Sequence, residues 1–372
     1  MDWQLIESDA ALAGLLARAE GCSAVMVDTE FMRRNTFFPQ VALLQLCFDD
    51  CDAAGTAWLI DPLKVTELDP LRALLQDARV VKVLHSASED LEVFQRWLGV
   101  LPAPLFDTQK AAALVGMDFG LGYRNTVLEL CGEDLPKGET RSDWLQRPLT
   151  ESQCHYAAQD VIWLLQVYHI LAQRCREQDR FDWVLEEGAA ACNGLASDVG
   201  GYYLRIKQAW KLAPRQLATL IAVCDWRDQV ARDEDRPRSW IIDDQACMQL
   251  ARLQPRDMGQ LRGKVEMHPR VLRRHGEALL ELVAAQDHLS PEQLPETLPE
   301  PLAARQRDQL KQLKQRLEHI GRDLGIAPQM LLSSRDLEQL LRDGAAKPPQ
   351  WQGWRQPRVI EPLCNYLREL AA

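Results

Sequence analysis

Four carboxylates and one tyrosine are the residues of this sequence best suited to chemistry. They form three separate segments: Asp28 with Glu30, then Asp90, then Tyr156 with Asp160. Apolar runs precede the first two segments, and the period of two along a strand would place Asp28 and Glu30 on one face. The spacing of four in the third segment would place both residues on one face of a helix. Carboxylates without His or Cys ligands suit Mg²⁺ or Mn²⁺, which suggests phosphodiester hydrolysis assisted by two metal ions.

The three segments, in this order, resemble the three motifs of the DEDD family of 3′→5′ exonucleases, and the tyrosine resembles that of its DEDDy branch. The intervening stretch Lys137–Trp144, followed by Arg147-Pro148-Leu149, is similar to the segment before the third motif in the ribonuclease D family. The resemblance covers nearly all 372 residues, because the C-terminal part also resembles the helical domains of that family. A lone Asp-x-Glu pair would be weak evidence, whereas the ordered set is specific.

The resemblance implies a role for each of these residues. Asp28 would bridge two divalent ions, either Mg²⁺ or Mn²⁺. Glu30 and Asp160 would complete the site of one ion, and Asp90 would support the other. Tyr156 would orient the attacking water. For any single carboxylate, a turn, a helix cap or a solvated position is the simpler alternative, but four in matching order favour the metal site.

His155 is an alternative to Tyr156, because His155 and Asp160 have the His-x₄-Asp spacing of the sister DEDDh branch. In a helix, Tyr156 lies about 40° from Asp160 around the axis, whereas His155 lies about 140° away. The apolar residues Ala157 and Val161 indicate that the helix has already begun at this point. We therefore predict that Tyr156, and not His155, belongs to the site.

Four further residues have two interpretations each. His85, just before the second segment, could contact substrate, although a strand-end histidine bound to the backbone is the more common arrangement. A basic stretch contains Lys137, Arg141 and Arg147. These three side chains could contact phosphates near the site or belong to a solvated loop.

Strand-like and helix-like segments alternate through the first 200 residues. Strands are predicted at 23–31, 41–48, 57–61, 80–85 and 104–107, with helices at 68–77, 88–98 and 150–174. The first three strands are close enough in sequence to form an antiparallel meander, and Thr150 to Gln153 has the pattern of a capping box. The order predicts an α/β domain, a mixed sheet flanked by helices, as in ribonuclease H-like exonucleases.

The chain beyond Gly200 has only helical patterns. Ala213–Leu217, Asp225–Asp228 and Arg236–Arg238 resemble the HRDC domain, and a proline-rich stretch at 290–301 indicates a linker. We therefore predict three domains: an exonuclease domain at 1–200, an HRDC domain at 204–288 and a second, degenerate HRDC-like domain at 302–372.

The distribution of charge changes what the net charge implies. The total is −11, but residues 1–200 hold 16 Lys and Arg against 31 Asp and Glu, whereas residues 201–372 hold 27 against 23. An acidic half with a metal site and a mildly basic half fits an enzyme that binds a polyanion, although such a small surplus is also ordinary. A fragment ending near Gly200 is expected to keep every proposed metal ligand and to cleave short single strands with metal present, but to lose affinity for longer structured RNA.

Composition excludes several classes of protein. Apolar runs are too short to span a membrane, and the N-terminus does not have the pattern of a secretory signal. Ten scattered cysteines without a C-x-x-C pair predict reduced thiols and a cytoplasmic protein. No Walker-type motif occurs, so no nucleotide cofactor is expected.

The resemblance implies a metal-dependent 3′→5′ exoribonuclease that trims the 3′ ends of small structured RNAs such as tRNA precursors, releasing nucleoside 5′-monophosphates. The helical domains would position RNA through backbone contacts. Two alternatives are a DNA 3′→5′ exonuclease with the same metal site and a non-catalytic nucleic-acid-binding protein on a decayed scaffold. The sequence alone does not decide between RNA and DNA.

Overall fold

The computed structural model describes residues 2–136, 138–139, 142–197, 200–343 and 351–371. The chain divides into two compact units. The first contains residues 1–32, 39–196 and 303–372, and the second contains residues 33–38 and 197–302. Residues 303–372 thus share a unit with the N-terminal part, while the division into three domains stays a prediction.

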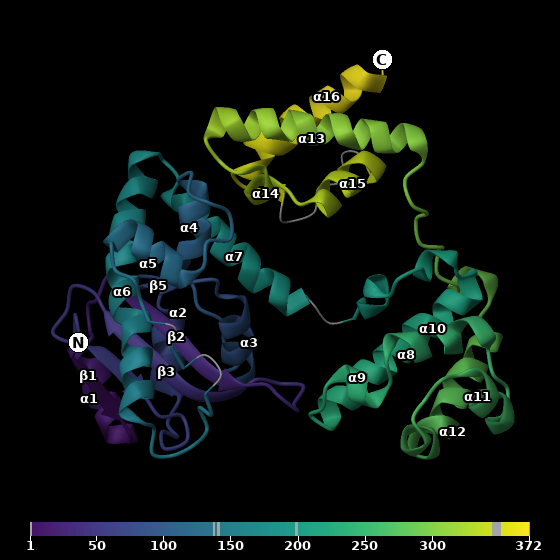
Figure 1. The fold of residues 1–372 in the computed structure, drawn as a ribbon, viewed down its shortest axis with the longest axis horizontal. Helices are drawn as coiled ribbons and strands as arrows, with labels where there is room; N and C mark the ends of the chain where they lie inside the picture. Colours follow the sequence, from purple (N-terminus) through teal and green to yellow (C-terminus); the bar gives the residue numbers. More distant parts are fainter. Residues whose placement is uncertain (1, 137, 140–141, 198–199, 344–350, 372) are drawn as a thin grey trace. The chain divides into compact units, whose positions relative to one another are not determined.

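A six-stranded mixed sheet forms the centre of the first unit (Figure 1). Its strands are β1 (Trp3–Ile6), β2 (Ala24–Met32), β3 (Gln40–Phe48), β4 (Ala57–Ile60), β5 (Val81–Leu84) and β6 (Leu105–Asp107). The order across the sheet is β1-β4-β3-β2-β5-β6. Strands β2, β3 and β4 pair antiparallel, which confirms the predicted meander, whereas β5 and β6 extend the sheet in parallel with β2. The short edge strand β1, parallel to β4, was not among the predicted strands.

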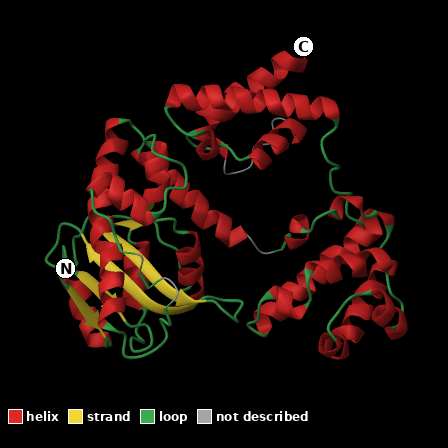
Figure 2. Ribbon diagram, viewed as in Figure 1, coloured by secondary structure: helices red, strands yellow, loops and turns green. Residues whose placement is uncertain are grey.

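Helices cover both faces of this sheet (Figure 2). They are α1 (Asp9–Arg18), α2 (Asp69–Gln76), α3 (Ser88–Trp97), α4 (Thr108–Leu114), α5 (Tyr123–Cys131), α6 (Glu151–Glu177) and α7 (Phe181–Ser197). One core packs α1, α2 and α3 against one face, and a second core packs α4, α5 and α6 against the other. The predicted capping box begins α6, with Thr150 and Gln153 bonded reciprocally. The predicted fold class, a mixed sheet flanked by helices, is confirmed.

The C-terminal helices of the first unit continue its hydrophobic core. They are α13 (Ala304–Leu324), α14 (Pro328–Leu331), α15 (Ser334–Asp343), the π-helical turn Gln356–Ile360 and α16 (Glu361–Ala371). Their buried residues belong to the same apolar cluster as α4, α6 and α7. This shared core explains why residues 303–372 form one unit with the sheet.

Polar and aromatic contacts complete this attachment. The indole rings of Trp183 and Trp354 stack with centroids 4.6 Å apart and planes 7° from parallel. The Trp354 indole N–H donates to Glu187 at 2.9 Å, and the Arg355 guanidinium pairs with the same carboxylate. A fragment ending near Gly200 would expose this apolar surface of α7, so we expect it to be less stable than the intact chain.

The second unit is helical. Its main helices are α8 (Pro214–Asp233), α9 (Arg238–Ile241), α10 (Asp244–Leu253), α11 (Met258–Lys264) and α12 (Pro269–Ala285), joined by short 3₁₀ turns at Tyr202–Arg205, Ala209–Lys211, Gln286–His288 and Pro291–Gln293. One apolar core holds α8, α10, α11 and α12 together. Arg227, buried in α8, donates to Asp244 at 2.9 Å and to the Ile242 carbonyl at 3.2 Å.

Among the residues that the structure describes, no helix has the length and apolar character needed to cross a membrane.

The stacked tryptophans provide a test of how strongly the C-terminal helices are attached. We expect Trp354→Ala to lower the unfolding free energy of the first unit by about 3–5 kcal/mol, because it removes a buried ring and leaves a cavity against Trp183. The melting temperature of the intact protein measures the effect. Trp240, which is 54% exposed in the second unit, provides the control. An equal loss in Trp240→Ala would contradict the assignment of this interface.

Candidate active site

The alternation of side chains along β2 determines which site residues meet. Ala24 and Met26 belong to the core with α4, α5 and α6, whereas Val25 and Val27 belong to the core with α1, α2 and α3. Because this alternation continues along a strand, Asp28 and Glu30 lie on the face covered by α6. Thr29, between them, lies on the face covered by α3.

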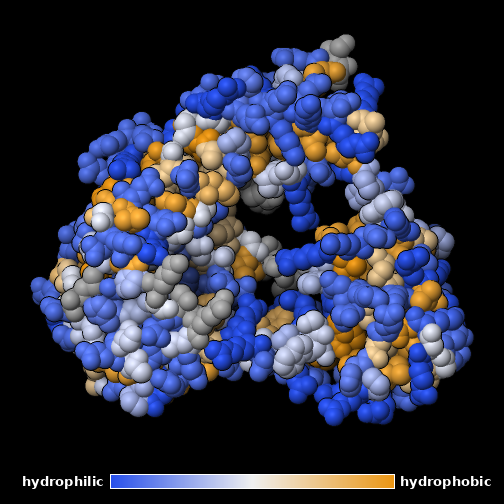
Figure 3. All heavy atoms as spheres, viewed as in Figure 1, coloured by the Kyte–Doolittle hydropathy of each residue, from blue (hydrophilic) through white to orange (hydrophobic). Residues whose placement is uncertain are grey.

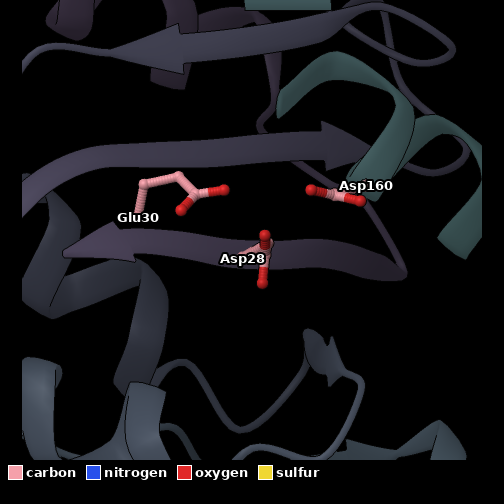
Figure 4. A group of neighbouring side chains, drawn as sticks. All are labelled: Asp28, Glu30 and Asp160. Carbon is pink, nitrogen blue, oxygen red and sulfur yellow. The ribbon is translucent and has the colours of Figure 1, made fainter. Parts of the chain in front are cut away.

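Three of the predicted carboxylates converge. Asp28 and Glu30 from β2 meet Asp160 from α6, and one oxygen from each carboxylate lies within 4.8 Å of the others (Figure 4). All three residues are half-buried. Oxygen ligands at this spacing suit a hard divalent cation, which would also offset the charge of the cluster. The donor set therefore fits the metal that the sequence predicts.

Asp90 lies beside this cluster but is not part of it. It is 8% exposed in the first turn of α3. The hydroxyl of Thr29 donates to Asp90 Oδ1 at 2.5 Å. One oxygen of Asp90 is thus held by the strand that carries the other two carboxylates. The hydrogen bond fixes the position of α3 relative to β2 at the site.

A cleft of about 310 Å³ contains all the predicted site residues. Its lining includes Asp28, Glu30, Asp90, Tyr156 and Asp160, together with Thr29, His85, Glu89 and Tyr123. The site residues come from β2, α3 and α6, which are distant in sequence. The structure thus brings the three sequence segments into one cleft, although the catalytic role of each residue stays a prediction.

Burial raises the pKa of the four predicted carboxylates Asp28, Glu30, Asp90 and Asp160, and repulsion from neighbouring carboxylates raises those of Asp28 and Glu30 further. Burial, followed by repulsion from Asp160, raises the pKa of Glu30 to about 9 and that of Asp28 well above its usual range. Burial raises the pKa of Asp160 to about 8 and that of Asp90 to about 7. Without a compensating cation, the protein therefore disfavours full ionisation of the four groups at neutral pH.

The structure places Tyr156 and His155 differently. Tyr156 is half-buried and lines the cleft, whereas His155 is exposed and does not. The His155 ring instead lies 3.4 Å from the Gln159 amide nitrogen. Burial, and then the charge of Asp160, raise the pKa of Tyr156 above its ordinary value. Its hydroxyl is therefore neutral, so it can accept or donate a hydrogen bond at working pH.

Gly138 packs directly against the ring of Tyr156. A Cβ atom at this position would lie 2.1 Å from Tyr156 Cδ2, so any larger residue would force one of the two to move. Glu139, the next residue, accepts a hydrogen bond from the Ser152 hydroxyl of α6 at 2.7 Å. This loop therefore limits the positions that the tyrosine ring can occupy.

Tyr123 supports Asp160 from α5, a contact that the sequence analysis missed. Its hydroxyl donates to the Asp160 carbonyl at 2.7 Å and lies 3.1 Å from the Gln159 carbonyl. Its ring also packs against the edge of His85, with centroids 5.4 Å apart. No local pattern predicts this contact, because it depends on how α5 packs against α6.

His85 and Arg147 are held by other parts of the protein. His85 Nδ1 lies 2.9 Å from the Thr108 hydroxyl and its Nε2 lies 3.1 Å from the Leu121 carbonyl. Arg147 forms two hydrogen bonds with the buried carboxylate of Asp61, at 2.7 and 2.8 Å, and three with backbone carbonyls. These partners favour a structural role over a phosphate contact for Arg147. Lys137 and Arg141 lie outside the described residues.

Comparisons with known families identify two regions of the chain. A family model described as 3′-5′ exonuclease matches residues 3–176. A model of the HRDC domain matches residues 216–283. The first match contains every predicted site residue, and the second lies within the helical second unit.

Curated relatives match over nearly their whole length. Ribonuclease D of Pseudomonas paraeruginosa is 44% identical over 371 residues, which cover 98% of this chain and 97% of the relative. Ribonuclease D of Escherichia coli is 36% identical and covers 99% of both chains. The crystal structure of the Escherichia coli RNase D, described as an exoribonuclease involved in structured RNA processing, superposes with a TM-score of 0.91 at 34% identity and covers 99% of both chains. A protein from Bifidobacterium adolescentis shares the fold at 20% identity, with a TM-score of 0.66.

The raised pKa values predict how metal and pH act on stability. Without metal, the folded protein retains protons that the unfolded carboxyls release near pH 4, so its stability should fall as pH rises from about 5 to 9. Metal binding requires the ionised carboxylates, so the stabilisation by added Mn²⁺ should grow over the same range. We expect the rise in melting temperature to be roughly 3–6 °C larger at pH 8.5 than at pH 6.

Asp28→Asn serves as the matched variant, since it removes the charge shared by the cluster with little change in shape. It should raise the melting temperature of the metal-free protein at pH 8.5 and reduce the response to Mn²⁺. Melting curves in chelator and in Mn²⁺, at constant ionic strength, measure both effects. A response to Mn²⁺ that is independent of both pH and Asp28 would place the cation elsewhere.

Proposed function

Because this chain belongs to the ribonuclease D family, it is a 3′→5′ exoribonuclease, and we propose that it trims the 3′ ends of small structured RNAs such as tRNA precursors. It would release nucleoside 5′-monophosphates and act in the cytoplasm. The observation that supports the proposal best is the convergence of Asp28, Glu30 and Asp160 in one cleft with Asp90 and Tyr156.

The carboxylates provide a site for divalent cations. Glu30 and Asp160 would hold one ion with Asp28, and Asp28 with Asp90 would hold a second. Two such ions, Mg²⁺ or Mn²⁺, would supply Lewis acidity and neutralise charge at the scissile phosphate. Asp90 has one oxygen bonded to Thr29, which leaves its second oxygen as the available ligand.

Tyr156 would orient the water that attacks the phosphorus atom. Its raised pKa argues against a phenolate base, because the hydroxyl keeps its proton at neutral pH. A neutral phenol both donates and accepts hydrogen bonds, so it can hold a water molecule in line with the leaving 3′-oxygen. The close approach of Gly138 would keep the ring in place during this step.

Two alternative functions would each give a different result in the digestion experiment described next. A DNA exonuclease would use the same carboxylates, and discrimination would rest on the 2′-hydroxyl of RNA. A non-catalytic binding protein is disfavoured because all four carboxylates are present and line one cleft.

The test is digestion of 3′-labelled RNA and matched DNA, with Mg²⁺, with Mn²⁺ and with EDTA. We expect labelled mononucleotide from RNA as the first product, with no product in EDTA. A tRNA carrying a 3′ extension should be trimmed, and Asp28→Asn should lower turnover by roughly 10³-fold or more. Turnover by this variant above about a tenth of wild type would contradict the proposed role of Asp28.

Replacing Tyr156 and His155 in turn tests which side chain acts in the cleft. Tyr156→Phe removes only the hydroxyl, so we expect kcat to fall by roughly 10²–10³ while RNA affinity changes little. His155→Ala should have a mild effect, because this side chain is exposed outside the cleft. Single-turnover cleavage and RNA binding should be measured for both variants. The opposite ranking would assign the chain to the histidine-dependent mode of the DEDD family.

A further inference from the structure

Helix α13 has one buried and one exposed side. Its apolar residues Leu313, Leu317 and Ile320 are at most 7% exposed and belong to the core shared with α4 and α6. Packing on this side fixes the orientation of the helix within the first unit. The side chains on its outward surface therefore form a fixed pattern, and the surface over α13 is mostly hydrophilic in Figure 3.

Four cations form a basic ridge along this outward surface: Arg307, Lys311, Lys314 and Arg322. A helix turns 100° per residue, so the four side chains fall within an arc of about 80° and extend along about 22 Å of the helix. All four are exposed, and none forms an ion pair with any other residue that the structure describes. Glu318 is the one acidic residue in the same arc.

The positive surplus of the C-terminal half comes entirely from the part of the chain that contains the basic ridge. Residues 201–300 hold 15 Lys and Arg against 15 Asp and Glu, so they are neutral overall. Residues 301–372 hold 12 against 8. The basic part is therefore the segment beyond the HRDC match, which ends at residue 283.

We propose that the basic ridge of α13 binds the phosphate backbone of the RNA substrate. The inference rests on the proposed function, since it takes RNA as the ligand of the same compact unit that carries the active-site cleft. Each lysine or arginine that contacts a phosphate releases a condensed counterion, which favours binding at low and moderate salt. Such contacts position RNA without reading its sequence, as an enzyme that trims many 3′ ends requires.

The composition of the ridge favours RNA over a protein partner. Protein interfaces depend on apolar and aromatic side chains at their centre. The exposed large apolar residues of the described chain are Leu63, Phe119, Leu128, Leu204, Trp240 and Leu253, and none lies in α13. A polyanion requires only the cations, at intervals along an extended surface.

The test compares two charge reversals on the same helix. Lys311→Glu with Lys314→Glu alters the basic ridge. Arg305→Glu with Arg316→Glu changes the net charge by the same amount on exposed positions about 150° around the helix from the ridge. Binding of a labelled tRNA-sized RNA is measured by anisotropy in EDTA, where cleavage does not proceed, at several salt concentrations. Circular dichroism verifies that both variants fold.

We expect the ridge variant to lose about tenfold or more in RNA affinity at moderate salt, and its slope of log affinity against log salt to fall by about 1.4. The control variant should lose much less. Equal losses would show that only net charge matters, and no loss in either would show that the ridge does not bind RNA. Either result overturns this inference while wild-type cleavage of RNA still stands. A wild type that binds but does not cleave RNA with metal would instead contradict the proposed function.

Discussion

The repulsion among three half-buried carboxylates is the constraint on which the rest of the first unit depends. Asp28, Glu30 and Asp160 are held within 4.8 Å of one another, although burial and their shared charge disfavour ionisation. A cluster of this kind persists only where the surrounding structure is stabilised by other contacts. Strand β2 supplies this support because it pairs with β3 on one side and β5 on the other. Helix α6 supplies it through 27 residues whose buried side chains pack against the sheet.

Hydrogen bonds from neighbouring elements then place the carboxylates within this frame. Thr29 links Asp90 of α3 to β2, and Tyr123 links α5 to the backbone of Asp160. Asp107 joins the two layers in a similar way, because its carboxylate accepts from Ser86 and Ala87 before α3 and also caps α4. Each of these hydrogen bonds joins elements that are separate in the sequence. The geometry of the cleft is therefore a property of the packed layers and not of any one motif.

The C-terminal helices extend the same unit. Their apolar residues complete a core that begins in α4 and α6, and Trp354 stacks on Trp183 of α7. The basic ridge of α13 is thus carried by helices that are packed on the exonuclease fold, whereas the HRDC-matched residues lie in the second unit. An acidic catalytic region requires cations elsewhere to bind a polyanion. In the first unit, residues 303–372 contain more Lys and Arg than Asp and Glu.

The sequence by itself determined the motifs, the strand and helix periods and the capping box of α6, because each depends on residues a few positions apart. It also determined that Asp28 and Glu30 share a face, and that Tyr156 lies nearer than His155 to Asp160 around the helix. Only the tertiary structure decided the contacts between distant segments. Strand β1 is four residues long and is recognisable only by its pairing with β4. The partners of Thr29, Tyr123 and Arg147, and the membership of residues 303–372 in the first unit, depend on packing between elements far apart in the chain, for which local sequence carries no signal.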